Sequence, residues 1–338
     1  MIEFNFGYFS SERKAIMGLA ILWIMFFHCS GDYRSIPVIA GIKHFGNLGV
    51  EIFLLLSGVG LYYSAQNLHS GLGKNWIIEF YKKRFIRILP PTIICLLPWY
   101  LYLYNGQDTN PLRVFLDITS LSFWIDGKNR GWYVALTIVL YSFYPLLYCL
   151  VVKSNPKKLF YCIFLIVSDI FLNTAIALFN PDWFEMVNLA LCRAPIFIAG
   201  CFLAPLVRDG RKQKCLPPIC SLAIPFLVFI LLRFMGAVRA YGMWRYLYAV
   251  LGFCASVILV LLFHTVHEKW ISRFFGFFGE YTLELYLTHT QFLTVFEHHL
   301  KPMLSIKTIN VLAVGCSIIT AIIVHEGITY VKRTVRPE

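Results

Sequence analysis

Long apolar runs recur along the whole chain, and they constrain its fold more than any other feature of the sequence. Of the 338 residues, 58% are hydrophobic and only 14% are charged, whereas a soluble domain carries about a quarter charged residues. Repeated apolar runs with few charges inside them are typical of helices that cross a membrane. The sequence therefore predicts an all-α, polytopic membrane bundle.

The apolar runs delimit about ten transmembrane helices within a single membrane domain, residues 1–338. No small-residue cleavage site follows the first run, so we expect an anchor and not a removed leader. A polar loop over residues 105–131 is long enough to fold over a site. The expected spans are residues 14–29, 48–65, 92–104, 132–152, 159–178, 187–207, 217–235, 243–264, 279–296 and 308–331.

Basic residues lie mainly between these spans, and their distribution predicts the orientation in the membrane. Counting span ends with the adjoining loops, 19 of the 30 Lys and Arg residues lie on the side of the termini and 10 on the opposite side, and Arg193 alone lies well within a span. Cytoplasmic loops carry the excess of positive charge, so both the N- and the C-terminus are expected in the cytoplasm. Loops that face anionic lipid therefore account for the net charge of +12, and no nucleic-acid partner is expected.

The strongest basic cluster covers residues 74–87, where basic and apolar side chains alternate. This pattern predicts a helix lying in the membrane interface, which Pro90 and Pro91 should end before the third span. Arg84 and Arg87 share one face of that helix. Guanidinium groups bind phosphate oxygens in pairs, so this face could hold a phosphate-rich cytoplasmic cofactor. An anchor on anionic lipid is the alternative.

Ionisable residues inside spans are functional candidates, because a charge at the bilayer centre costs at least about 2.5–3.5 kcal/mol. The candidates are His28, Glu51, Arg193, Glu284 and His289. His28 ends the first span and Glu51 begins the second, so both should lie near the outer face. A carboxylate there could hold one imidazole nitrogen while the other acts as a general base. Two interfacial polar groups facing lipid headgroups would give the same pattern.

The remaining intramembrane candidates leave more than one interpretation open. Arg193 needs a counter-charge or carbonyl oxygens, and Glu51 and Glu284 are both possible partners. His289 is either a core histidine bonded between helices or part of a site. Ten cysteines are present without CxxC pairs and mostly inside apolar runs, so neither a disulfide framework nor a metal site is expected.

Six short motifs occur in an order that is more specific than any one of them. They are FFH ending at His28, GVEIFLLLSGVG with Glu51 and Ser57, RFIR from Arg84 to Arg87, WYVALTIVLYSFYP from Trp132, RAPIFIAG from Arg193, and YTLELYLTH with Tyr286 and His289. Through these motifs, residues 10–330 resemble the acyltransferase-3 family. Its members are bacterial integral-membrane enzymes that acylate, most often O-acetylate, cell-surface glycans.

The resemblance implies an O-acyltransferase of the bacterial inner (plasma) membrane. Its donor would be cytoplasmic acetyl-CoA, and its acceptor a hydroxyl of a cell-surface glycan or of its lipid-linked precursor. Membrane lipid and glycan-assembly enzymes are the further partners implied, and no metal is needed. The resemblance assigns catalysis to His28 and Glu51 and coenzyme binding to Arg84 and Arg87. The residues expected to support the site are Ser57, Trp132, Arg193, Tyr286 and His289.

Two positions depart from the family's pattern, and a second function also fits the sequence. Met17 stands eleven residues before His28, where the family usually has a basic residue, and Lys14 lies one turn further out. Thr137 stands where the fourth span commonly carries a glutamate. The alternative function is a transporter or glycan flippase that uses intramembrane His and Glu as a proton relay. Succinyl or another short acyl group would fit the same motifs as acetyl.

Overall fold

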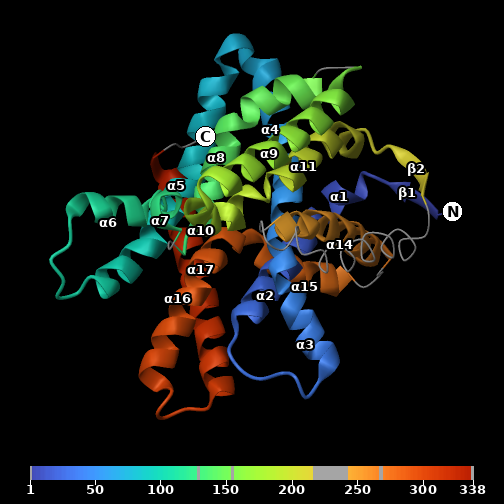
Figure 1. The fold of residues 1–338 in the computed structure, drawn as a ribbon. Helices are drawn as coiled ribbons and strands as arrows, with labels where there is room; N and C mark the ends of the chain where they lie inside the picture. The colour runs from blue at the N-terminus through green and yellow to red at the C-terminus, as the bar shows by residue number, and fades with distance from the viewer. Residues whose placement is uncertain (1, 128–129, 154–155, 216–242, 266–268, 336–338) are drawn as a thin grey trace.

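Helices make up nearly all of the computed structural model, which describes residues 2–127, 130–153, 156–215, 243–265 and 269–335 (Figure 1). Two short strands, β1 (Ile2–Asn5) and β2 (Lys212–Cys215), pair antiparallel. The helices are α1 (Tyr8–Ser11), α2 (Arg13–His28), α3 (Pro37–His44), α4 (Leu48–Leu72), α5 (Trp76–Leu103), α6 (Pro111–Ile118), α7 (Phe123–Asp126), α8 (Trp132–Leu147), α9 (Lys158–Phe179), α10 (Pro181–Leu191), α11 (Ala194–Arg208), α14 (Tyr246–Thr265), α15 (Lys269–Glu280), α16 (Thr282–Leu300) and α17 (Ile306–Val335).

Seven helical segments of the described chain are long and apolar enough to cross a membrane, which confirms the helical membrane class. The 16-residue α2 and the less apolar α16 cover the expected first and ninth spans. The expected seventh span, 217–235, lies outside the described residues. The count of ten and the side of the termini stay predictions. The seven segments are Pro37–Leu72, Trp76–Leu103, Trp132–Val152, Lys158–Phe179, Pro181–Arg208, Tyr246–Thr265 and Ile306–Thr334.

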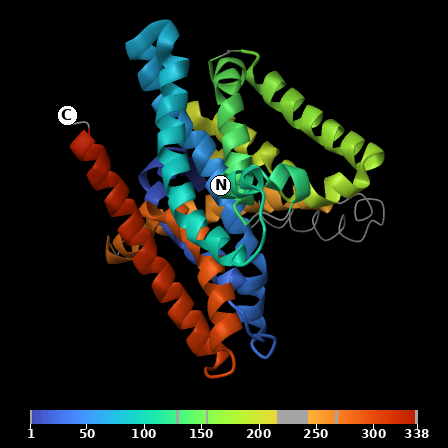
Figure 2. The ribbon, with the colours of Figure 1, turned by 90° about the vertical axis from the view of Figure 1, so that its left-hand side faces the viewer.

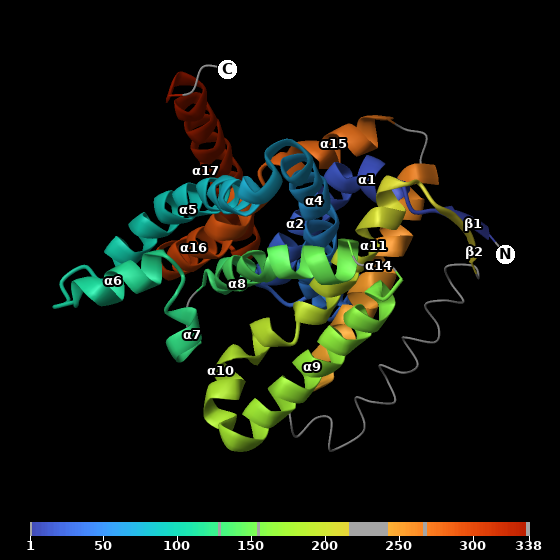
Figure 3. The ribbon, with the colours of Figure 1, turned by 90° about the horizontal axis from the view of Figure 1, so that it is seen from above.

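Helices α2 and α4 lie in the middle of the bundle, with α17 and α9 on opposite flanks (Figures 2 and 3). Helix α4 is apolar on all sides, and most of its residues are buried, as expected for a helix surrounded by others. By contrast, α9 and α17 expose large apolar side chains, among them Phe171 and Val311. Such faces suit contact with lipid tails.

Small residues allow α4 and α11 to touch backbone to backbone. A Cβ added to Gly58 would lie 2.6 Å from the Phe197 carbonyl oxygen, and one added to Gly200 would lie 2.2 Å from the Leu55 carbonyl oxygen. Close approach through small residues is a common way to pack helices in membranes. This close packing holds α11 against α4. Arg193, just before α11, and Glu51, near the start of α4, are thereby placed close together.

The expected helix end at Pro90 and Pro91 is wrong. Helix α5 continues through both prolines from Trp76 to Leu103. Just beyond them, the Thr92 hydroxyl donates to the Ile88 carbonyl over 2.7 Å, which satisfies a backbone group near the proline pair. The basic stretch is therefore the first part of a long membrane helix and not a separate interfacial helix.

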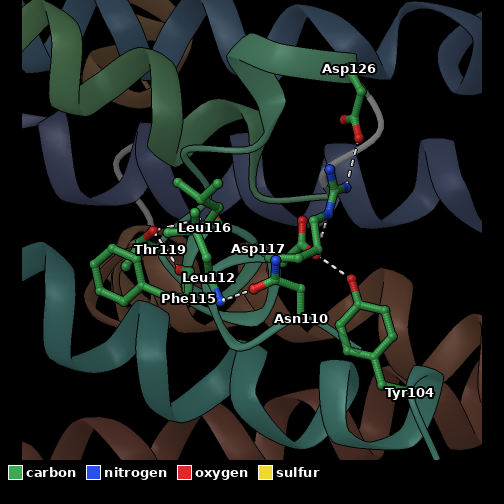
Figure 4. Close-up of polar contacts among 9 residues, drawn as sticks. Tyr104, Asn110, Leu112, Phe115, Leu116, Asp117, Thr119 and Asp126 are labelled. Atoms are coloured by element: carbon green, nitrogen blue, oxygen red, sulfur yellow. Dashed lines mark hydrogen bonds and ion pairs between the residues drawn. The ribbon is translucent and has the colours of Figure 1, made fainter. Parts of the chain in front are cut away.

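The expected polar loop of residues 105–131 contains two short helices, α6 and α7, held together by charge. Arg113 bonds Asp117 over 2.9 Å and Asp126 over 2.6 Å, and Tyr104 donates to Asp117 (Figure 4). The bond to Asp126 raises the pKa of the Arg113 guanidinium. Asn110 caps the start of α6. Periodicity alone did not reveal these elements because each is only one or two turns long.

Candidate active site

Three arginines line a cavity of about 200 Å³ beside the first residue of α2, here named the arginine cavity. Arg13 comes from α2, and Arg84 and Arg87 come from α5. The Arg13 Nε donates to the Leu56 carbonyl over 3.3 Å, and Arg84 donates to the Ser64 hydroxyl. The described lining contains no Asp or Glu. It also includes Met17, Phe53, Ser57, Gly60, Leu61, Ile88, Tyr133, Val134, Thr137, Tyr141, Thr282 and Leu283.

Such a cavity is suited to an anion with several charges, because its positive charges have no carboxylate of the lining to neutralise them. Arg84 and Arg87 were predicted to bind phosphate, and the structure brings them together with Arg13, which sequence reasoning missed. Lys14 points elsewhere, is exposed and pairs with Glu280 of α15. Helical spacing could have identified Arg13, since it lies one turn before Met17 on the same helix face.

His28 stands at the other end of α2, and its exposed side chain opens into two further cavities. The histidine cavity, about 420 Å³, is lined by His28, Ser30, Arg130, Trp132, Tyr286, His289, Thr290, Leu293, Thr294 and Glu297. The aromatic cavity, about 310 Å³, is lined by Ile24, Phe27, His28, His44, Asn47, Val50, Trp132, Leu189, Trp244, Arg245, Tyr248 and Tyr286. His28, Trp132 and Tyr286 line both.

The histidine cavity is rich in hydrogen-bonding groups. Arg130 donates to the Thr290 carbonyl over 2.7 Å and to the Thr294 hydroxyl over 2.8 Å, and it lies over the Trp99 ring at 4.4 Å. Burial lowers the pKa of the Arg130 guanidinium. On the same cavity, Glu297 accepts a hydrogen bond from the Ser30 hydroxyl. Charged donors and acceptors are thus available beside two aromatic rings.

The sequence predicted that Glu51 would bond to His28, and this prediction is wrong. Glu51 pairs with Arg193 over 2.9 Å instead. Both side chains are almost wholly buried, so each charge needs the other. Arg193 also donates to the Asn47 side chain over 3.0 Å and lies 4.8 Å over the Trp132 ring. Of the two possible partners of Arg193, the structure therefore selects Glu51. The other, Glu284, lies 3.0 Å from His325 of α17.

His289, which the sequence could assign to a site or to the core, lies within hydrogen-bonding distance of His28. His28 Nδ1 lies 3.2 Å from His289 Nε2, and the two ring centroids are 4.9 Å apart. The two residues come from α2 and α16. Their meeting could not be derived from sequence, since 261 positions separate them.

One layer of aromatic rings lies between the arginine cavity and the histidine cavity. Tyr133 lines the first, and Tyr286 lines the second. Their ring centroids are 5.0 Å apart, and Trp132 lies edge-on to Tyr286 at 6.4 Å. Thr137 lines the arginine cavity and donates to the Tyr133 carbonyl over 2.7 Å.

Asp169 and His325 are ionisable residues that the candidates chosen from the sequence did not include, although both lie inside expected spans. Asp169 of α9 accepts a hydrogen bond from the Tyr246 hydroxyl over 2.8 Å. His325 of α17 is the partner of Glu284. Neither lines the arginine cavity or the histidine cavity. The criterion of charge within a span was sufficient to find both.

Comparison with known proteins gives one match. A family model for an acyltransferase domain, acyltransferase-3, matches residues 15–325. The match therefore includes α2 from residue 15 to its histidine, α5 with Arg84 and Arg87, and α16 with His289, whereas Arg13 lies just before it. Searches among curated proteins and among solved structures found no match.

Proposed function

Because this chain belongs to the acyltransferase-3 family, we propose that it transfers an acetyl group from acetyl-CoA to a hydroxyl of a cell-surface glycan or its lipid-linked precursor. Family membership carries the acyltransferase role. The donor and the acceptor are supported by one observation above all. A single helix, α2, runs from a cavity lined by three arginines to an exposed histidine in a second, larger cavity.

The arginine cavity is the proposed coenzyme site. Arg13, Arg84 and Arg87 would bind the phosphate groups of acetyl-CoA, since guanidinium forks match phosphate oxygens. The thioester end would then point along α2 past Ser57 and Tyr133 toward the aromatic layer. The family match favours the transferase over the transporter alternative.

The histidine cavity is the proposed acceptor site. Trp132 and Tyr286 offer aromatic faces for a sugar ring, and Arg130 and Glu297 offer polar contacts for its hydroxyls. His28 takes the proton of the reacting hydroxyl while the oxygen attacks the thioester carbonyl. The new C–O bond forms, the C–S bond breaks, and the thiolate of CoA recovers the proton from His28. A positioned base of this kind contributes typically about 10²–10⁴-fold in rate.

Glu51 and Arg193 act in this proposal as positioning residues. Their buried pair holds the guanidinium over Trp132, and Trp132 borders both cavities at His28. Glu51 therefore supports the site through Arg193 and Trp132 and not by direct contact with the base.

The proposed location is the inner membrane of a bacterium. The arginine cavity and both termini would face the cytoplasm, where acetyl-CoA is found, and His28 would lie toward the outer face. The excess of Lys and Arg in the loops on the side of the termini supports this orientation. Glycan-assembly enzymes are the proposed partners that supply the acceptor.

Reconstituted liposomes test the proposal against its alternative. Acetyl-labelled acetyl-CoA is enclosed inside, and envelope glycolipids of the expressing bacterium are supplied outside. We expect label to appear in the outer glycolipid fraction only when the protein is present. Movement of glycolipid across the bilayer without labelling would favour the flippase. Absence of both label and movement would count against either function.

A further inference from the structure

His28 has an unusual set of neighbours for a general base. Within the described chain, no carboxylate is bonded to its ring. Its Nδ1 lies 2.9 Å from the Ile24 carbonyl oxygen and 3.2 Å from His289 Nε2. The residue that would normally orient such a base is an acidic side chain, and Glu51 is committed to Arg193.

Backbone carbonyls assign the proton positions on both rings. A carbonyl oxygen only accepts, so the Nδ1 of His28 must carry hydrogen to bond the Ile24 oxygen. The same argument applies to His289, whose Nδ1 lies 2.9 Å from the Leu285 carbonyl oxygen. In its neutral form His289 then has a lone pair on Nε2. That lone pair lies 3.2 Å from His28 Nδ1, so the single hydrogen on Nδ1 is shared between His289 Nε2 and the Ile24 carbonyl oxygen.

We propose that His289 is a positioning residue that accepts a hydrogen bond from His28 Nδ1–H and so keeps His28 Nε2 free as the basic atom. The inference rests on the proposed function, in which His28 is the base. When His28 takes the acceptor proton on Nε2, both its nitrogens carry hydrogen. His289 then stabilises the imidazolium through the same bond, and no proton passes to it.

Exposure separates the roles of the two histidines. His28 is exposed at the junction of the histidine and aromatic cavities, where an acceptor hydroxyl can reach it. His289 is only 1% exposed and is fixed by its bond to the turn before it in α16. Buried hydrogen bonds to charged groups gain strength because water does not compete for them.

Two substitutions distinguish a hydrogen-bonding role from simple packing. His289→Phe keeps a ring of similar size and removes the acceptor, whereas His289→Gln restores an acceptor oxygen near the place of Nε2. We expect His289→Phe to lower kcat for glycan labelling by about 10–100-fold, the value of a hydrogen bond to a charged group. The KM for acetyl-CoA should not change, and His289→Gln should stay within roughly threefold of wild type.

These kinetics would overturn the proposal in two ways. Full activity of His289→Phe would show that no acceptor is needed, and equal losses in the Phe and Gln variants at equal thermal stability would show that packing matters instead. If the unaltered protein labels no glycan, the proposed function fails, and the proton assignment is still decided by the measurement below.

Nitrogen NMR of histidine-labelled protein in nanodiscs reads the proton positions without any substrate. We expect neutral His28 to carry its hydrogen on Nδ1, and the proportion of the Nε2–H form to rise in His289→Phe. A wild-type His28 with hydrogen on Nε2 would overturn the proposal. So would a proton distribution that is identical in wild type and His289→Phe.

Discussion

Glu51 of α4 and Arg193 before α11 form a buried ion pair, with 2.9 Å between Oε1 and Nε. The guanidinium lies over Trp132 at the start of α8. The pair thus connects three helices directly beside the two cavities that share His28. A pair in this place affects both stability and activity.

Removing one member of the pair should be costly. Glu51→Ala leaves the Arg193 charge buried without its partner, and we expect unfolding in detergent to become easier by about 3–5 kcal/mol. The double variant Glu51→Leu with Arg193→Met removes both charges and should be more stable than either single variant. The exposed pair of Asp32 and Arg34 is the control, where loss of one member should leave stability nearly unchanged. A double variant no more stable than the singles would contradict this account.

Each arginine of the arginine cavity should contribute to coenzyme binding. Arg13→Ala, Arg84→Ala and Arg87→Ala are each expected to raise the KM for acetyl-CoA roughly tenfold, the value of one charge-assisted hydrogen bond. The matched control is Lys83→Ala, because Lys83 is exposed on the same helix and does not line the cavity. Equal KM values for Lys83→Ala and the three arginine variants would contradict a specific phosphate site.

Glu297 should act on the acceptor and not on the donor. It lines the histidine cavity far along α16, and Glu297→Gln removes its charge at nearly constant size. We expect the KM for the glycan acceptor to rise several-fold, with an unchanged KM for acetyl-CoA. The exposed Glu185 provides the control substitution Glu185→Gln. A rise in the KM for acetyl-CoA would indicate that the donor binds in the histidine cavity, which would contradict the proposed coenzyme site.

Gly252 of α14 makes room for Glu51. A Cβ on Gly252 would lie only 2.3 Å from the Glu51 Cβ, whereas a Cβ on Gly327 of α17 would meet no atom within 4 Å. Gly252→Ala should therefore lower both stability, by about 1–3 kcal/mol, and glycan labelling. Gly327→Ala should leave both unchanged or slightly improve stability. Equal behaviour of the two variants, measured by thermal unfolding, would contradict the packing at Glu51.

The sequence predicts the helical membrane class well because apolar runs report directly on the lipid surroundings. It also singles out His28 at the end of α2 and the RFIR motif of α5, since both stand out from apolar or alternating neighbours. It fails at Pro90 and Pro91, where the local cost of proline is offset within a long helix. Local rules carry no information about such compensation.

Partners across the bundle are the part that the sequence could not supply. Equal depth suggested that Glu51 meets His28, but depth does not determine which way a side chain points around its helix. Because α11 approaches α4 closely at Gly58 and Gly200, Glu51 forms its ion pair with Arg193. The packing of α16 beside α2 brings His289 within 3.2 Å of His28. Contacts of this kind depend on three-dimensional packing between distant segments.

The most direct test of the central claim compares wild type with His28→Gln in the liposome assay, with acetyl-CoA binding measured on the same preparations. If His28 is the base, glycan labelling falls by about 10²–10⁴-fold while the affinity for acetyl-CoA is retained, because the arginine cavity lies at the other end of α2. Labelling at the wild-type rate in His28→Gln would contradict the assignment of His28 as the catalytic base.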